Sequence, residues 1–167
     1  KEEIYPHERL WRSSNFLFEK IKNDPDNDYL ILPTLVTICF AYEAFINFSG
    51  YLLLPEVWIE EKNNFLNKGI EDKVDAITKI LPDYTWTKGE RPYQTIKKLW
   101  TFRNIAVHGK IQFRTYERDL EAFPNFIFEH EWDRYLKKEF VIVSRTDVKQ
   151  FCQTLVVAMR IKLFDEP

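Results

Sequence analysis

Apolar residues recur every three or four positions along several stretches of the chain, which is the spacing of amphipathic helices. Residues 7–22 show it with charged residues between, and residues 33–54 are apolar on nearly all sides, as in a central core helix. Residues 56–81 predict a helix that is broken near Gly69 and stopped by Pro82. Residues 92–108 predict another, with Pro92 at its start and Gly109 after its end.

The helical pattern weakens after residue 109. Residues 130–139 favour a short helix, and residues 140–144 (FVIVS) a short strand or an extended lead-in. Ser144 or Thr146 is expected to cap a last helix that runs to about Phe164. The chain of 167 residues is long enough for one core. We therefore predict an all-α fold, a single domain over residues 1–167, as a four- to five-helix bundle with an irregular insert around 110–145.

The composition, with 45% hydrophobic and 30% charged residues, is that of a water-soluble globular protein. The apolar run over residues 29–55 raises a membrane span as an alternative. Glu43 and Asn47 interrupt that run, so we favour a core helix and expect no membrane contact. Cys39 and Cys152 lie in apolar helical patterns, which is typical of reduced, buried thiols. With no signal peptide visible, we expect a cytoplasmic protein.

Arg103 is out of place in its predicted helix, because it falls near the middle of the apolar stripe. A buried guanidinium needs anionic or carbonyl partners, since an unpaired interior charge is very costly. Glu43, the only charged residue of the central helix, is the obvious partner for a structural ion pair. The other interpretation is that this face opens into a cleft or a dimer seam where Arg103 meets phosphate. Geometry leaves both interpretations open. The stripe itself is expected to contain Ile96, Leu99, Trp100, Ala106 and Val107.

Asn104 and His108 are four residues apart and share a helix face beside that stripe, together with Lys97 and Thr101. His108 stands in the last turn, where the helix dipole favours a cation, and an imidazole exchanges protons near neutral pH. For a lone histidine the simpler interpretation is that it caps the helix carbonyls before Gly109.

Charge along the chain strengthens the functional interpretation. Between residues 88 and 118, basic residues outnumber acidic ones by eight to two in a chain of net charge −2. Aromatic residues are interleaved with them, so the stretch could contact phosphates and stack on unpaired bases. Lys97, Lys110 and Arg114 are the candidate substrate-binding residues. The alternative is a solvated basic face whose aromatic residues belong to the core.

The stretch FRNIAVHG, residues 102–109, resembles the signature of the HEPN superfamily. That signature is an Arg, often followed by a polar residue, and then a His after four to six intervening residues at a helix end. Arg103, Asn104 and His108 match it, and AYEAFIN at residues 41–47 is similar to the family's second core helix. The motif covers about residues 95–110, and the architecture about residues 30–165. The insert has no place in the family pattern.

The resemblance implies a helical bundle that dimerises and brings two Arg/His motifs together across the seam. It also implies a metal-independent endoribonuclease of toxin or antiviral defence type, with RNA as substrate and a protein antitoxin as a candidate partner. His108 would act as general base or acid and Arg103 would stabilise charge on phosphate, with Asn104 orienting one of them. Glu43 and Asn47 are candidates to orient this set or to hold it structurally.

No cofactor and no metal site are expected, because His7, His108 and His130 have no metal-ligand spacing. Two other functions stay open. One is a non-catalytic member of the same family that binds nucleotide, RNA or a protein partner. The other is a purely structural bundle in which Arg103 pairs with Glu43 and His108 is a helix cap.

Overall fold

The computed structural model describes residues 5–24, 28–82, 84–108 and 131–164. Within these ranges all regular structure is helical. The elements are α1 (Pro6–Asn23), η1 (Asp28–Leu30), α2 (Ile31–Leu53), α3 (Pro55–Ile59), α4 (Glu61–Asn64), α5 (Ile70–Thr78), α6 (Tyr93–His108), η3 (Asp133–Tyr135) and α7 (Lys138–Phe164). The predicted all-α class is therefore confirmed.

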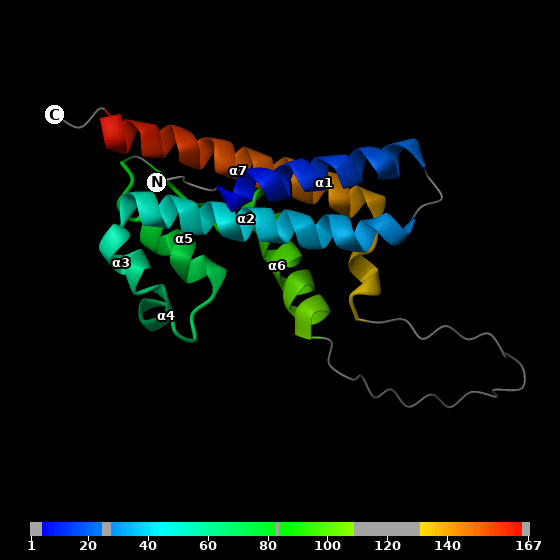
Figure 1. The fold of residues 1–167 in the computed structure, drawn as a ribbon, viewed down its shortest axis with the longest axis horizontal. Helices are drawn as coiled ribbons and strands as arrows, with labels where there is room; N and C mark the ends of the chain where they lie inside the picture. The colour runs from blue at the N-terminus through cyan, green and yellow to red at the C-terminus, as the bar shows by residue number, and fades with distance from the viewer. Residues whose placement is uncertain (1–4, 25–27, 83, 109–130, 165–167) are drawn as a thin grey trace, which may run out of the picture.

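Helix α2 is the centre of the structure. It contacts α1, α3, α5, α6 and α7, and its buried side chains include Leu35, Ile38, Tyr42 and Ile46. Figure 1 shows α1, α2 and α7 running side by side, with α5 and α6 on the other side of α2. Residues 28–53 have the length and hydropathy of a membrane span, but half of the most apolar 18-residue window in this range is buried inside the protein. Such burial is typical of a core helix, because a lipid-facing helix keeps its apolar side chains outward.

Most of the predicted helices are confirmed within a few residues, but the start of the last one is wrong. Residues 140–144 are neither a strand nor an extended lead-in, because α7 begins at Lys138. Ser144 is buried inside the helix, and the Thr146 hydroxyl donates to the carbonyl of Ile142, so neither is a cap. Four consecutive apolar residues, 140–143, suggested extended structure, but one helical turn can bury part of such a run.

The irregular insert predicted over residues 110–145 ends earlier than expected, because α7 begins at Lys138. Residues 109–130 lie outside the described ranges, and the predicted short helix at 130–139 is replaced by η3 and the first residues of α7. Tyr135 of η3 packs its ring against Phe102 of α6, at 5.8 Å between ring centroids. The segment from residue 131 onward therefore closes the bundle beside α6.

Helices α3, α4 and α5 turn the chain back from the end of α2 toward α6. Gly50 permits this return, because a Cβ at that position would overlap the indole ring of Trp58 in α3. Helix α5 then begins with a capping contact, in which the Gly69 amide donates to Asp72 Oδ2 at 2.7 Å. Ile70, Val74 and Ile77 anchor α5 in the core. This arrangement brings the first turns of α5 close to α2.

The buried face of α6 only partly matches the predicted stripe. Ile96 and Leu99 are buried as expected, Trp100 and Ala106 are half-buried, but Val107 in the last turn is half exposed. The prediction missed Phe102, which is fully buried. The structure packs α6 against both α2 and α7. A helix between two neighbours buries a wider arc of its surface.

Candidate functional site

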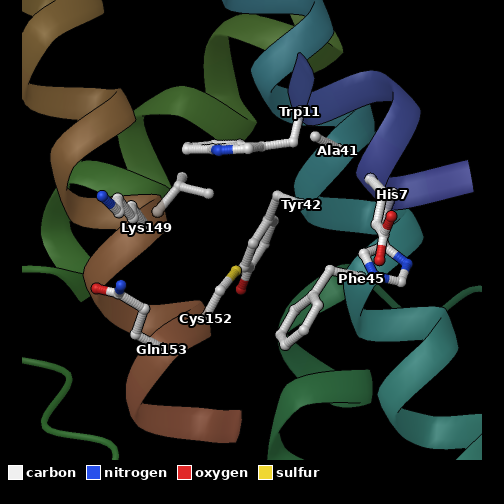
Figure 2. A pocket seen from close by; sticks show the side chains of 10 residues that line it. His7, Trp11, Ala41, Tyr42, Phe45, Lys149, Cys152 and Gln153 are labelled. Carbon is white, nitrogen blue, oxygen red and sulfur yellow. The ribbon is translucent and has the colours of Figure 1, made fainter. Parts of the chain in front are cut away.

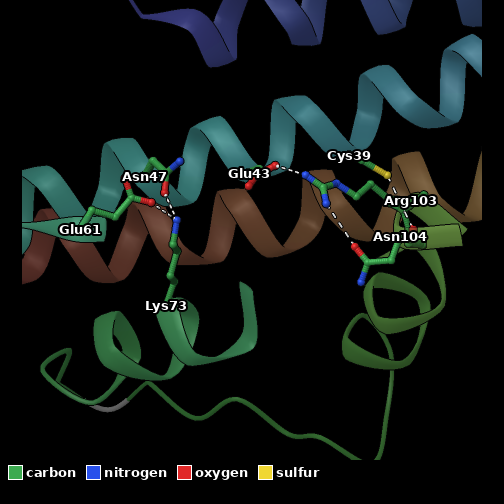
Figure 3. A network of polar contacts seen from close by, with 8 residues as sticks. Cys39, Glu43, Asn47, Glu61, Lys73, Arg103 and Asn104 are labelled. Atoms are coloured by element: carbon green, nitrogen blue, oxygen red, sulfur yellow. Dashed lines mark hydrogen bonds and ion pairs between the residues drawn. The ribbon is translucent and has the colours of Figure 1, made fainter. Parts of the chain in front are cut away.

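A cleft of about 260 Å³ lies where α2, the start of α5 and the middle of α6 meet. Figure 3 shows the polar contacts that these elements make along one face of α2. Cys39, Glu43 and Asn47 are spaced four residues apart and so share that face. The residues that line the cleft are three cations, one carboxylate, one amide and three uncharged residues: Lys68, Lys73, Arg103, Glu43, Asn104, Gly69, Ile70 and Trp100.

Arg103 reaches into this cleft from α6 with its side chain 22% exposed. Its Nη2 lies 3.5 Å from Glu43 Oε2, and the Glu43 side chain is 30% exposed. Its Nη1 donates to Asn104 Oδ1 at 3.2 Å, and its guanidinium carbon lies 5.0 Å from the Trp100 ring centroid. The ion pair expected from the sequence is therefore present, as one long contact rather than a bidentate pair.

The guanidinium of Arg103 keeps unused hydrogen-bonding capacity. Its Nε is buried and has no acceptor among the residues that the structure describes. A buried donor without an acceptor costs about 1–3 kcal/mol. Native proteins seldom keep such a group without a reason, and a ligand that supplies the missing acceptor is one such reason. A ligand oxygen that reached this Nε would complete the hydrogen bonding of the guanidinium.

Lys73 of α5 is a second cation in the cleft, which the sequence analysis did not select. Its ammonium donates to Asn47 Oδ1 at 2.9 Å and to Glu61 Oε1 in an ion pair. Asn47 therefore contacts Lys73 rather than Arg103. A signal for Lys73 was present in the sequence, because positions 70, 73, 74 and 77 form one buried stripe with a lysine in it. Arg103 stands out in α6 in the same way.

His108 lies one helical turn beyond Asn104 and is exposed, but it does not line the cleft. Lys97 and Thr101 are exposed on α6 as well, so this face of the helix meets solvent. Lys110 and Arg114 lie outside the described residues. The structure thus brings Arg103, Asn104 and Glu43 together and leaves His108 at the end of the same helix.

A second arginine just before α6 is bound very differently. Arg91 Nε and Nη2 donate to the two carboxylate oxygens of Asp147 in α7, at 2.8 and 2.7 Å. Asp147 is only 1% exposed. Burial alone would raise the pKa of Asp147, but hydrogen bonds from Arg91 and Thr95 and the charge of Arg91 outweigh it, and the pKa is lowered. This pair ties the start of α6 to α7.

Another cavity, of about 270 Å³ between α1, α2 and α7, has a different chemistry. Trp11, Tyr42 and Phe45 form much of its wall (Figure 2). Burial lowers the pKa of His7 and raises the pKa of both Tyr42 and Cys152. All three shifts disfavour a charged form, so this cavity is a poor place for a phosphate.

Comparisons with protein-family models, curated proteins and solved structures found no match to this chain. Among the described residues, no three His, Cys, Asp or Glu side chains are grouped so that they could hold a metal ion.

Proposed function

We propose that this protein is a metal-independent endoribonuclease of the HEPN type, built on a HEPN-like helical bundle. The observation that carries the proposal is the incompletely satisfied guanidinium of Arg103, which faces a polar cleft on the helix that ends in exposed His108. Cleavage of RNA without a metal needs a cation at the phosphate and a group that exchanges protons near neutral pH. Arg103 and His108 supply these two chemistries on one helix.

The reaction would be a transesterification within the RNA. A base removes the proton from the ribose 2′-oxygen, which attacks the adjacent phosphorus, and the bond from phosphorus to the 5′-oxygen breaks. An acid returns a proton to that leaving oxygen, which gives a 2′,3′-cyclic phosphate and a 5′-hydroxyl end. Arg103 would stabilise the negative charge on the phosphate oxygens in the transition state. His108 would be the base or the acid.

Two copies of the chain would complete the site. His108 is not a lining residue of the cleft that holds Arg103 of its own chain. In a symmetric dimer, two α6 ends could face each other, so that the two His108 side chains divide the roles of acid and base. We propose a cytoplasmic homodimer that acts as a toxin or antiviral defence effector, held in check by a protein antitoxin.

A second candidate function is binding without turnover, to RNA, a nucleotide or a protein partner. The Arg103–Glu43 contact favours it, because a nearby carboxylate competes with phosphate for the arginine. The position of His108 outside the cleft favours it too, since binding alone has no need of a proton-transfer group.

Incubation of purified protein with mixed single-stranded RNA in excess EDTA distinguishes the ribonuclease from a protein that binds without turnover. The ribonuclease proposal predicts cleavage with 2′,3′-cyclic phosphate and 5′-hydroxyl ends, and a loss of about 100-fold or more in rate for His108→Ala. Lys79→Gln, a change at an exposed lysine directly after α5 and outside the cleft, is the matched control and should cleave normally. Equal cleavage by wild type and His108→Ala would point to a contaminant and reject the proposal. RNA binding without cleavage would favour the second candidate.

A further inference from the structure

The cleft beside Arg103 contains two more cations that the resemblance to the HEPN signature does not involve. Lys73 is buried in the first turns of α5, and Lys68 lies just before that helix and is exposed. Both line the same cleft as Arg103 (Figure 3 shows Lys73 and Arg103). Lys68 and Lys73 are close in the sequence, but Arg103 lies in a different helix far along the chain, so the fold brings the two lysines to Arg103.

We propose that Lys68 and Lys73 form a second phosphate subsite, which holds the RNA backbone phosphate next to the one at Arg103. This inference rests on the proposed function, since it extends the substrate path of the same site. The path would run from the exposed end of α6 past Asn104 and Arg103 to the start of α5. Single-stranded RNA fits it, because a groove of positive charge follows the backbone and an aromatic residue such as Trp100 can stack on a base.

The contacts of the two lysines leave room for such a ligand. Lys73 donates to Asn47 and Glu61, and an ammonium group has more hydrogens than these two acceptors use. Lys68 donates to the backbone carbonyl of Asn64 at 2.9 Å, a neutral acceptor that does not cancel its charge. Within the described lining, Glu43 is the single carboxylate, and Glu61, which is not a lining residue, contacts the Lys73 ammonium. Among the described contacts, Lys73 and Arg103 each have a carboxylate partner, whereas Lys68 has a backbone carbonyl, so Lys68 contributes the unbalanced positive charge of the cleft.

The size of the cleft favours a polymer over a free nucleotide. At about 260 Å³ it is smaller than the roughly 300–1,000 Å³ of sites that enclose a whole small ligand. A segment of a longer chain needs only part of its length enclosed, while the rest follows the outer surface of α6. Exposed Lys97 on that surface would continue the path.

The subsite is tested by fluorescence anisotropy with a 2′-O-methyl RNA oligonucleotide at several salt concentrations. The methyl group removes the nucleophilic 2′-hydroxyl, so this RNA binds without being cleaved by the proposed reaction. Lys68→Gln and Lys73→Gln should each weaken binding by about tenfold, the loss of one charged hydrogen bond. Each should also reduce the slope of log affinity against log salt by about 0.7, as expected for one lost contact to single-stranded RNA. Lys79→Gln is the control and should change neither quantity.

Two further variants guard against loss of folding. Lys73→Arg keeps the charge and should retain most of the affinity. Glu61→Gln removes the carboxylate that competes for Lys73 and should tighten binding, which a merely structural lysine would not do. If Lys68→Gln and Lys73→Gln stay folded and bind RNA with unchanged affinity and slope, the subsite is rejected. If AMP displaces the oligonucleotide as well as unlabelled RNA does, the occupant is a free nucleotide and the RNA path is rejected.

This design separates the inference from the proposed function. Lysine-dependent binding by a protein that cleaves no RNA would support the subsite and reject the ribonuclease. Cleavage that depends on His108 but not on Lys68 or Lys73 would reject the subsite alone.

Discussion

Arg91 and Arg103 lie twelve positions apart, and each pairs with a carboxylate from another helix, yet the two pairs differ in kind. Arg91 makes two short hydrogen bonds to both oxygens of buried Asp147. Arg103 makes one contact of 3.5 Å to half-buried Glu43 and keeps a buried Nε without an acceptor among the described residues. Bidentate arginine–carboxylate geometry is the strong form of the interaction, and a single long contact is the weak form.

The difference shows which arginine is committed to the fold. The Arg91–Asp147 pair is bidentate and ties the start of α6 to α7, so a ligand would have to compete with two short hydrogen bonds. Both arginines line a cavity, but the Arg103–Glu43 contact is single and long, so an oxyanion that binds Arg103 competes only with a weak pair. An arginine paired with a carboxylate is therefore not by itself evidence for either structure or function. The geometry of the pair separates the two cases.

The largest expected effect is a difference in RNA cleavage rate between variants of the two arginines. Arg103→Ala should lower the rate of RNA cleavage by about 100- to 1,000-fold, the loss typical of a group that stabilises transition-state charge. Arg91→Ala should cleave at close to the wild-type rate at temperatures where it is folded. Single-turnover cleavage assays at matched folded fractions, checked by circular dichroism, measure both. Equal losses for the two variants would mean that Arg103, too, acts through the fold.

The next largest expected effect is a difference in the free energy of unfolding between variants of the two carboxylate partners, Asp147 and Glu43. Asp147→Ala should reduce the free energy of unfolding by about 2–3 kcal/mol, because it removes charged hydrogen bonds at a buried position. Glu43→Ala should cost less than about 1 kcal/mol, since its pair is single, long and partly exposed. Urea unfolding followed by circular dichroism gives both values. A larger loss for Glu43→Ala than for Asp147→Ala would reverse the assignment of the two pairs.

A smaller effect is expected on the stability of the protein at acid pH. Because the pKa of Asp147 is lowered in the folded state, its contribution to stability is complete above its unfolded pKa of about 3.9. The contribution is lost as the pH falls through the lowered folded pKa. Asp147→Asn should therefore lose less stability than the wild type between about pH 4 and pH 2. Urea unfolding at a series of pH values tests this, and parallel losses would show that other groups dominate acid unfolding.

The sequence predicted much of the fold because helical periodicity is a local property. The bounds of α1 followed from apolar spacing, and those of α2 and α6 from apolar spacing together with the prolines near their ends. The start of α7 was mispredicted, because four apolar residues in a row suit a strand as well as one buried helical turn. The set of residues that line the cleft could not be predicted from the sequence, because they come from three separate segments. The sequence indicated Glu43 as a candidate partner of Arg103, because Arg103 falls in an apolar stripe and Glu43 is the only charged residue of the central helix. Lys73 was not predicted, because it reaches the site only through the return of the chain over α3 to α5.

We propose that Arg103 is available to bind an anion, whereas Arg91 belongs to the fold. Side-chain Nε–H resonances of the arginines, assigned by substitution, report it directly when the 2′-O-methyl RNA oligonucleotide is added to the protein. We predict that the Arg103 Nε–H signal shifts strongly, as its empty donor gains a phosphate oxygen, and that the Arg91 signal stays in place. An Arg103 signal that does not move while RNA binds, or an Arg91 signal that moves as much, would contradict the account.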